Sequence, residues 1–352
     1  MDEFRGKRIL VVGGAGFVGT NLVKTLLHSS PAAILIVDNL LSAERVNIPL
    51  SEKVNFIEGS ITDEKVLSEF EDDLDYIFHL ATYHGNQNSI YNPLADHENN
   101  ALTTIKLFDR IKNFKKIRKI VYASAGCTVA EKTFDEAHPT REDEPVSLYL
   151  DSPYQISKII GEFYSNYYFK QNHLPVVKAR FQNVYGPGEI LGAGKWRGTS
   201  ATVWRNVIPT FIYRALKKMS LSVENEGIAT RDFIYVDDIV NGLLLCAQHG
   251  LAGEVYNLAS GTETSIKHLA LLANEITGNP APIQFRPKRD WDNCGKRFGS
   301  TLKAKEKIVF ESQVGLKEGV VRTIQWTEQN LPLIEACIRR HAAYIACDER
   351  KD

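Results

Sequence analysis

Short, continuously apolar runs alternate along the first half of the chain with longer segments of helical periodicity. Runs of this kind are typical of strands buried on both faces of a parallel sheet. They occupy residues 9–12, 34–37, 76–81, 120–123 and 176–181. Strands that alternate with helices in this way predict a doubly wound parallel sheet in an α/β fold, in which ligands bind beyond the carboxyl ends of the strands.

The pattern of the sequence changes beyond the last of these runs. A Gly-rich and Trp-bearing stretch, "GPGEILGAGKWRG", is followed by scattered short strand and helix patterns. We expect residues 1–185 to form the sheet domain, with some later segments returning to it, and residues 186–330 to form mainly a smaller α/β lobe that binds the substrate. Residues 331–352 are expected to form a C-terminal helical tail. Helical periodicity begins at residue 318, and Pro332 predicts a break in it.

Composition and charge exclude several classes of function. The 352 residues carry a formal charge of −1. The chain therefore has no net positive electrostatic field that would attract nucleic acid or an anionic membrane. The longest apolar stretches, such as "AAILIV", are far shorter than the ~20 residues of a membrane span, and the N-terminus lacks a secretory pattern. The five cysteines are scattered, without metal-binding or disulfide spacing. We therefore expect a cytoplasmic protein that has no structural metal and does not enter the membrane.

A glycine-rich stretch follows the first apolar run, with three of its glycines spaced three residues apart. Gly13, Gly16 and Gly19 in "VVGGAGFVG" stand between a strand and an amphipathic helix. Glycine at such a turn lets backbone N–H groups and the helix N-terminus approach a pyrophosphate. Asp38 ends the second strand, where a carboxylate accepts hydrogen bonds from a ribose 2′-hydroxyl and repels a 2′-phosphate. The pattern predicts a Rossmann domain that binds NAD in preference to NADP.

A second motif opens a helix near residue 153. Ser152 and Pro153 have the character of an N-cap and a first helical residue. Tyr154 and Lys158 then lie on the same helical face, one turn apart. A Tyr and a Lys at this spacing are usually surface residues, but after a dinucleotide motif they indicate a catalytic pair. Lowering a phenol pKa from about 10 to about 7 requires roughly 4 kcal/mol, which an adjacent ammonium and an oxidised nicotinamide can supply.

These motifs belong to a wider family resemblance that covers nearly the whole chain. The sequence resembles the extended short-chain dehydrogenase/reductase proteins, specifically the nucleotide-sugar epimerases and dehydratases, and most of all the epimerases of surface-polysaccharide gene clusters. The matching motifs are "GGAGFVG", "HLAT", "NPLADHEN", "YQISK", "RFQNVYGPG", "NVIP", "TRDFIYVDD" and "KRDWD". The last three are the most discriminating, because ordinary dehydrogenases lack them.

The resemblance implies NAD as cofactor, a nucleotide-diphosphate sugar as substrate, and Tyr154 and Lys158 as catalytic residues. It also implies a homodimer, formed through the helix that begins at Tyr154 and the helix around residues 99–111. Besides the catalytic pair, the expected cofactor contacts are Gly13, Gly16, Phe17, Val18, Gly19, Asp38, Asn39, Ser60, Ile61, Leu80, Ala81, Thr82 and Asn99. The expected substrate contacts are His84, Asn183, Lys195, Asn206, Arg231 and Arg289.

Two positions depart from the family pattern. Where relatives carry an Asp that contacts adenine, the stretch "IEGSITD" carries Ser60. In "ASAGCT", the position of the family's catalytic Ser or Thr is held by Ala125. Ser124 or Thr128 is a candidate source of the missing hydroxyl, and both also fit the character of plain loop residues. The sequence leaves this part of the site unassigned.

Cys127 falls where the 4,6-dehydratase relatives carry a catalytic Glu, which argues against dehydration. The same position resembles the Cys that acts as acid and base in GDP-mannose 3,5-epimerases, with Lys195 as a candidate companion acid. The competing interpretation of Cys127 is a small packing residue beside the cofactor. His84 is likewise either a sugar contact or a structural histidine.

The main hypothesis is NAD-dependent epimerisation of a nucleotide-diphosphate sugar through a transient 4-keto intermediate, with the UDP-hexose 4-epimerase type preferred. C3 or C5 epimerisation, dehydration and decarboxylation of a nucleotide sugar are the alternatives within the enzyme class. From a different class, the chain is an NAD-binding regulatory protein without turnover. The presence of both Tyr154 and Lys158 argues against that last alternative.

Overall fold

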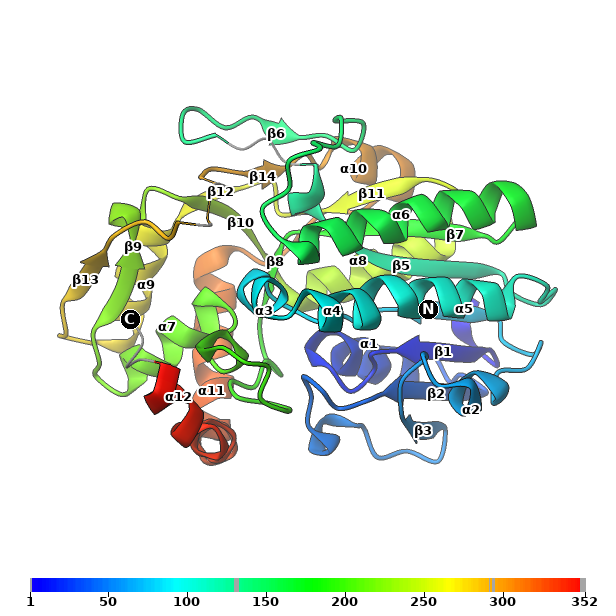
Figure 1. Cartoon of the computed structure of the whole chain (residues 1–352), viewed down its shortest axis with the longest axis horizontal. Coiled ribbons are helices and arrows are strands. Elements are labelled where there is room, and N and C mark those ends of the chain that lie inside the picture. The colour runs from blue at the N-terminus through cyan, green and yellow to red at the C-terminus, as the bar shows by residue number, and fades with distance from the viewer. Residues whose placement is uncertain (1, 130–132, 291, 293–294, 349–352) are drawn as a thin grey trace.

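The computed structural model of the chain describes residues 2–129, 133–290, 292 and 295–348. It contains a larger part built around a parallel sheet and a smaller part made of short strands and helices (Figure 1). The chain enters the smaller part after it has formed six of the seven strands of this parallel sheet, and it later returns to the larger part. The two parts lie side by side, and the site described below lies between them.

The sheet of the larger part has seven parallel strands in the order β11-β7-β5-β4-β1-β2-β3. The strands are β1 (Arg8–Val12), β2 (Ala33–Asp38), β3 (Val54–Glu58), β4 (Tyr76–His79), β5 (Lys119–Ala125), β7 (Val176–Phe181) and β11 (Val255–Leu258). All five predicted apolar runs lie in this sheet, which confirms the doubly wound fold. The strand order reverses between β1 and β4, and such a switch point opens a crevice beyond the carboxyl ends of the strands.

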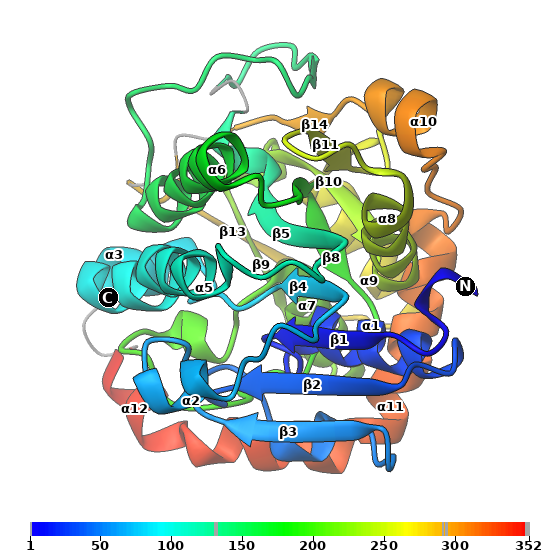
Figure 2. The same ribbon diagram turned by 90° about the vertical axis from the view of Figure 1, so that its right-hand side faces the viewer.

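Helices cover both faces of this sheet (Figure 2). One face carries α2 (Glu64–Ser68), α5 (Thr103–Ile111) and α6 (Pro153–Asn172), and α5 is preceded by α3 (Asn86–Tyr91), α4 (Pro93–Asp96) and a π-helical segment at His97–Leu102. The opposite face carries α1 (Phe17–Leu27), α8 (Val236–His249) and α10 (Leu302–Ile308). The helices therefore leave only the strand ends open to a ligand.

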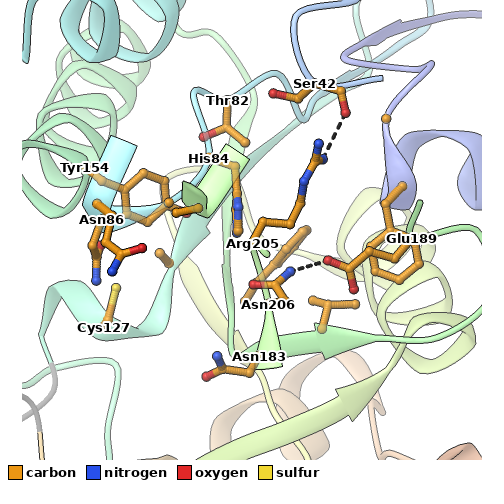
Figure 3. Close-up of a pocket in the computed structure, with 18 of the residues that line it drawn as sticks. Ser42, Thr82, His84, Asn86, Cys127, Tyr154, Asn183, Glu189, Arg205 and Asn206 are labelled. Atoms are coloured by element: carbon orange, nitrogen blue, oxygen red, sulfur yellow. Dashed lines mark hydrogen bonds between the residues drawn. The ribbon is translucent and has the colours of Figure 1, made fainter. Parts of the chain in front are cut away.

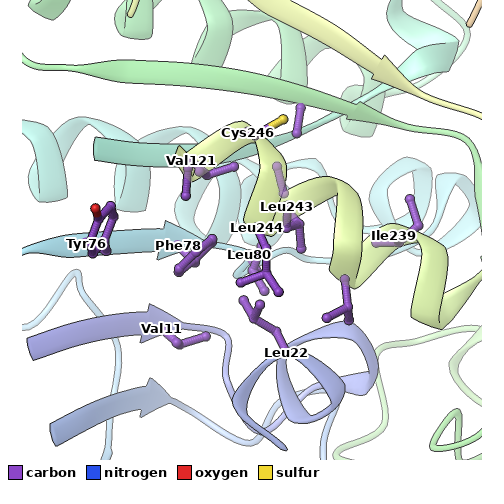
Figure 4. Close-up of a cluster of buried hydrophobic side chains, with 14 of the residues drawn as sticks. Val11, Leu22, Tyr76, Phe78, Leu80, Val121, Ile239, Leu243, Leu244 and Cys246 are labelled. Atoms are coloured by element: carbon purple, nitrogen blue, oxygen red, sulfur yellow. The ribbon is translucent and has the colours of Figure 1, made fainter. Parts of the chain in front are cut away.

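Each central strand supplies side chains to two hydrophobic cores, one on each face. On β1, Val11 faces the core under α1 and α8, while Leu10 faces the core under α5 and α6. Figure 4 shows the first core, in which Val11, Leu22, Phe78, Val121, Leu243 and Ile239 are fully buried. Burying one such side chain contributes about 1.5–3 kcal/mol, so the sheet is a firm base for the site at its edge.

Three elements of the larger part come from late in the sequence. β11 pairs with β7 in parallel, with Val255 opposite Lys178 and Leu258 opposite Phe181. α8 packs against β5 and β7, and α10 packs against α8 and β11. The chain therefore crosses between the two parts more than once, which holds the walls of the crevice together.

The smaller part has its own core, in which Phe211, Leu269 and Val320 are buried together. Its strands are β8 (Asn183–Tyr185), β10 (Thr230–Tyr235) and β12 (Glu263–Ser265) in one sheet, and β9 (Leu221–Glu224) paired with β13 (Ile283–Arg286). Its helices are α7 (Val207–Leu216), α9 (Ile266–Thr277) and α11 (Leu316–Arg340). A short pair, β6 (Pro139–Thr140) with β14 (Phe298–Gly299), and the final helix α12 (Ala342–Asp348) complete the fold.

The predicted break at Pro332 is wrong. α11 runs through Pro332 and ends only at Arg340, before α12. A proline inside a helix leaves the carbonyl group four residues earlier without its donor. Pro332 is exposed, so water can satisfy that carbonyl and the helix continues.

The described residues contain neither a membrane-spanning helix nor a cluster of metal ligands. No helix within them is both long and apolar enough to cross a bilayer. In the same part of the chain, no three His, Cys, Asp or Glu side chains come together in a way that could hold a metal ion.

Candidate active site

A cavity of about 630 Å³ opens between the two parts, beyond the carboxyl ends of β1 and β4. Of the residues that the sequence singled out, Gly19, Thr128 and Lys195 do not line it. The predicted residues that do line it are Gly13, Gly16, Phe17, Val18, Asp38, Asn39, Ser60, Ile61, Leu80, Ala81, Thr82, His84, Asn99, Ser124, Cys127, Tyr154, Lys158, Asn183, Asn206, Arg231 and Arg289. One cavity thus brings together motifs that lie far apart in sequence, from Gly13 to Arg289.

The glycine loop between β1 and α1 forms one end of the cavity. Gly13 has a φ of +83°, and a Cβ there would lie 2.6 Å from the backbone nitrogen of Ala81. At Gly19, a Cβ would lie 2.2 Å from the carbonyl oxygen of Gly13, so this glycine serves the packing of α1 on the loop. The start of α1 therefore lies at the cavity, and Gly13 and Gly16 add no side chain in front of its N–H groups.

Asp38 stands at the end of β2 beside this loop. Its carboxylate accepts hydrogen bonds from the backbone N–H groups of Ala15 (3.1 Å) and Leu40 (2.9 Å). Burial raises the pKa of Asp38, and the backbone N–H groups oppose that rise. A carboxylate held by backbone N–H groups and a glycine loop with no room for a Cβ are features that suit a dinucleotide. The residues present therefore fit NAD.

Two further predicted contacts extend the same wall. Asn39 donates a side-chain hydrogen bond to Asn99 (3.1 Å), which ties the segment after β2 to the helical segment before α5. The hydroxyl of Ser60 accepts a hydrogen bond from the hydroxyl of Thr62 (2.8 Å). Where relatives carry an acid, this wall therefore presents a neutral hydroxyl.

Helix α6 carries the Tyr and Lys pair into the middle of the cavity. The Ser152 side chain caps the helix by accepting from the N–H of Gln155 (3.4 Å), and Pro153 is its first residue. The ammonium nitrogen of Lys158 lies 6.0 Å from the centre of the Tyr154 ring and donates to the carbonyl oxygen of Ala123 (3.0 Å). The pair predicted from the sequence is therefore assembled at the crevice.

Burial dominates the titration of this pair. It lowers the pKa of Lys158 to about 8, against the attraction of the Asp96 charge. It raises the pKa of Tyr154, and the neighbouring Cys127 and Asp96 add to the rise, while the Thr82 side chain opposes it. Burial also raises the pKa of Asp96 to about 6. Without further positive charge near its oxygen, the Tyr154 phenol stays protonated at neutral pH.

At the end of β5, the two hydroxyls that the sequence offered as candidates make hydrogen bonds within the protein. The Ser124 hydroxyl donates to a carboxylate oxygen of Glu162 (2.6 Å), and Glu162 is held by Arg180 through two hydrogen bonds of 2.8 Å. The Thr128 hydroxyl donates to the carbonyl oxygen of Ala125 (2.8 Å) and does not reach the cavity. Both candidate hydroxyls are thus already bonded within the fold.

Cys127 and His84 face the cavity near Tyr154 (Figure 3). The thiol of Cys127 points towards Asn86, whose side-chain oxygen accepts a hydrogen bond from Ser152 (3.0 Å). The His84 and Tyr154 rings lie edge to face with centres 6.1 Å apart. Burial and then the charge of a nearby arginine lower the pKa of His84 to about 3, so His84 is neutral at pH 7.

The smaller part contributes Arg205 and Asn206, just before α7 (Figure 3). Arg205 donates to the carbonyl oxygens of Ser42 (3.0 Å) and Ala193 (2.5 Å), so it bridges the two parts. Asn206 donates to the carboxylate of Glu189. Burial raises the pKa of Glu189 to about 7, against the effects of Asn206 and Arg205. This wall therefore carries a fixed cation and an acid that titrates near neutrality.

Lys195 is the predicted substrate contact that the structure places elsewhere. Its side chain is exposed outside the cavity, and its backbone N–H donates to the carbonyl oxygen of Leu41 (3.0 Å). The backbone of this segment packs against the larger part, which turns the lysine to the surface. The structure therefore does not bring Lys195 together with Cys127, whereas Arg205 is a cation that the neighbouring segment does place in the cavity.

Asn183, Arg231 and Arg289 line the far end of the cavity. Arg231 forms an ion pair with Asp292 (3.7 Å), and Arg289 forms one with Glu224 (2.5 Å). The two arginines come from β10 and from the segment after β13, which only the folding of the smaller part brings together. They form a cationic end opposite the glycine loop.

Four residues that were not predicted from the sequence also line the cavity: Arg205, Glu189, Asn86 and Ser42. A signal existed for two of them, because Arg205 directly precedes Asn206 in "WRNVIP" and Asn86 follows His84 closely in "HGNQNS". Glu189 and Ser42 stand in loops without periodicity, where only tertiary contacts decide which side chains turn inwards.

Comparisons with known proteins agree with this geometry. The model of the NAD-dependent epimerase/dehydratase family matches residues 9–259. The UDP-glucose 4-epimerase of Mycolicibacterium smegmatis is 30% identical over 329 residues, which covers 91% of this chain and 98% of that protein.

Solved structures of enzymes are also similar to this chain. The WbmF enzyme of Bordetella bronchiseptica, solved in complex with NAD⁺ and UDP, is 55% identical, with a TM-score of 0.89 over 99% of this chain and 100% of WbmF. The UDP-glucose 4-epimerase of Thermotoga maritima, solved with UDP-glucose, is 30% identical, with a TM-score of 0.83 over 92% of this chain and 99% of that one. The chain therefore belongs to the NAD-dependent epimerase/dehydratase family.

Proposed function

We propose that this protein inverts C4 of a UDP-hexose through a transient 4-keto sugar, with NAD held as a cofactor. The observation that carries the proposal is the Tyr154 and Lys158 pair, which lies in one cavity between the glycine loop and a cationic end. The choice of UDP is supported by relatives named UDP-glucose 4-epimerase and by the complex of WbmF with UDP.

In this proposal Tyr154 is the base. Its phenolate takes the proton of the sugar C4 hydroxyl. When bound, NAD⁺ supplies the acceptor for the C4 hydride and afterwards returns the hydride to the other face of the ketone. The Lys158 ammonium favours the phenolate, and its hydrogen bond to Ala123 fixes its direction. Because burial raises the pKa of Tyr154, the positive charges beside it are required for the first proton transfer.

The cationic end is proposed to hold the diphosphate. Arg231 and Arg289 already pair with carboxylates, and we infer that the diphosphate takes the place of those partners when the substrate binds. A diphosphate is a strong acceptor for the planar guanidinium group. Binding at this distance from Tyr154 leaves the sugar free to turn over between the two hydride transfers.

Cys127 favours one second candidate function. Its thiol lies in the cavity near Tyr154, where it is placed to exchange a proton with a carbon beside the 4-ketone. That chemistry would invert C3 or C5 instead of C4. Dehydration has less support, because the carboxylate that the dehydratase relatives use at this position is a thiol here.

Incubation with a panel of UDP-, GDP-, dTDP- and CDP-sugars in D₂O, read by NMR and mass spectrometry, tests both functions. If C4 alone is inverted, the product carries no deuterium on carbon. In that case Cys127→Ala keeps the rate within about tenfold, since it removes little volume and no proton carrier.

Two other outcomes would contradict the main proposal. Deuterium on a ring carbon that disappears in Cys127→Ala would assign the enzyme to C3 or C5 epimerisation. Bound NAD without conversion of any nucleotide sugar in the panel would indicate a regulatory NAD-binding protein.

We also propose that the protein is a homodimer formed through α5 and α6. On α6, Ile156, Phe163 and Tyr167 form an exposed apolar stripe, with exposed fractions of 45%, 57% and 55%. Tyr168, by contrast, is buried in the core under this helix. Exposed apolar stripes of this kind usually mark an interface, and the family resemblance supports this one.

Phe163→Glu is expected to convert the dimer to a monomer, because a carboxylate in an apolar interface loses its hydration without gaining a partner. Light scattering at micromolar concentration measures the change. Leu302→Glu on α10 is the matched control, since Leu302 is also exposed (66%) but lies outside the stripe. A wild-type protein that is monomeric in this experiment would remove the dimer proposal.

The cellular setting is part of the same proposal. Cys246 and Cys337 are buried and unpaired, as in proteins of reducing compartments, which supports a cytoplasmic location. The family resemblance supports a role in supplying sugars for a surface polysaccharide.

A further inference from the structure

The proposed reaction raises the question of what replaces the hydroxyl that relatives carry at residue 125. Ala125 ends β5 and lines the cavity, but its methyl group offers no hydrogen bond. Ser124 and Thr128 are 3% and 1% exposed, and the proton of each hydroxyl is already donated within the fold. The neighbours of Ala125 on its own strand therefore do not supply the missing group.

The segment that follows the neighbouring strand carries another hydroxyl. β4 runs parallel to β5 and ends at His79, opposite Tyr122. The chain then leaves the sheet, and Thr82 lies in this segment, three residues after His79. Thr82 and Ala125 both line the cavity, so Thr82 offers a hydroxyl to the space in which Ala125 offers none.

The hydroxyl of Thr82 has no hydrogen-bond partner among the residues that the structure describes, although its oxygen is buried. Buried hydroxyls are nearly always bonded, so an unsatisfied one that lines a cavity indicates a missing partner. Figure 3 shows this oxygen on the side of Thr82 that faces Tyr154. It also opposes the rise in the pKa of Tyr154 that burial causes, which requires it to lie close to the phenol.

We propose that Thr82 is a positioning residue that takes over the role of the hydroxyl missing at Ala125. It donates a hydrogen bond to the oxygen of Tyr154 and so holds the phenolate towards the C4 hydroxyl of the sugar. The inference rests on the proposed function. It changes the expected role of Thr82 from a cofactor contact to a partner of the base, and the two roles make different predictions.

Thr82→Val removes the hydroxyl and keeps the shape of the side chain. In the NAD-loaded protein we expect it to raise the pKa of Tyr154, measured as the phenolate absorbance that Tyr154→Phe lacks. In the pH dependence of kcat, the apparent pKa that belongs to this base moves to higher pH, because the loss of the donor disfavours the phenolate. At neutral pH, kcat for a UDP-hexose falls about 10- to 100-fold, the range for a hydrogen bond to a charged group.

Two variants control this measurement. Thr82→Ser keeps the hydroxyl and is expected to retain both the pKa of Tyr154 and the rate. Ala125→Ser in the Thr82→Val background places a hydroxyl at the position where relatives carry one, and we expect it to lower the pKa of Tyr154 again and to recover the rate. The affinity for NAD, measured by calorimetry, is expected to stay at the wild-type value in all three variants.

Three results would overturn the proposal. The first is a Tyr154 pKa that does not change in Thr82→Val. The second is a loss of NAD affinity that accounts for the whole loss of rate, which would make Thr82 a cofactor contact. The third is a failure of Ala125→Ser to reverse the effects of Thr82→Val. The titration needs no turnover, so it decides the role of Thr82 even if no UDP-hexose is a substrate.

Discussion

Tyr154→Phe is expected to lower kcat by about 10²- to 10⁴-fold or more, the range for removal of a general base. The 4-ketone forms only if the C4 hydroxyl loses its proton, and Phe cannot accept it. The nearby His84 is a poor substitute, since burial and then the charge of Arg205 lower its pKa to about 3. An imidazole of that pKa holds a proton too weakly to act as the base at neutral pH.

The measurement is the interconversion of UDP-glucose and UDP-galactose, together with the amount of NAD that stays bound. Tyr149→Phe is the matched control, because it makes the same change at a residue that is 84% exposed. The control should keep the wild-type rate, and both variants should keep NAD. A Tyr154→Phe enzyme that retains its rate within about tenfold would show that another group is the base.

The largest expected effect on stability is at the buried ion pair between Arg180 on β7 and Glu162 on α6. Both side chains are 5% exposed, and two hydrogen bonds of 2.8 Å join them. Arg180→Met would leave the carboxylate of Glu162 buried without its cation. We expect it to lower the free energy of unfolding by about 3–5 kcal/mol, the usual cost of removing one partner of a buried pair.

Urea unfolding followed by circular dichroism measures this loss. The exposed pair of Lys317 and Glu275 is the control, with exposed fractions of 69% and 65%, and Lys317→Met should change the free energy by no more than about 1 kcal/mol. The double variant Arg180→Met/Glu162→Leu should recover most of the loss, because it removes both charges. If Arg180→Met lowered the free energy of unfolding by as little as Lys317→Met does, Glu162 would not be a buried charge that depends on Arg180.

Most of the larger part was predictable because its signals are local. Each buried parallel strand is a continuous apolar run, and β7 has the same bounds as its predicted run. Less local features were harder to predict. β4 ends at His79, two residues before the predicted end at Ala81, because the chain there leaves the sheet to line the cavity. β11 belongs to the same sheet because it pairs with β7, and no local sequence pattern predicts this pairing.

For the site, the sequence alone determined the glycine loop, Asp38 and the spacing of Tyr154 and Lys158. Each of these depends on a turn, a strand end or one turn of helix, which neighbours in sequence build. The tertiary structure decided which polar groups are available to a ligand. It bonded Ser124 to Glu162, turned Lys195 to the surface and brought Arg205 into the cavity. It also brought Thr82, which follows β4, and Tyr154, on α6, into the same cavity, because the packing of these segments depends on residues far apart in the chain.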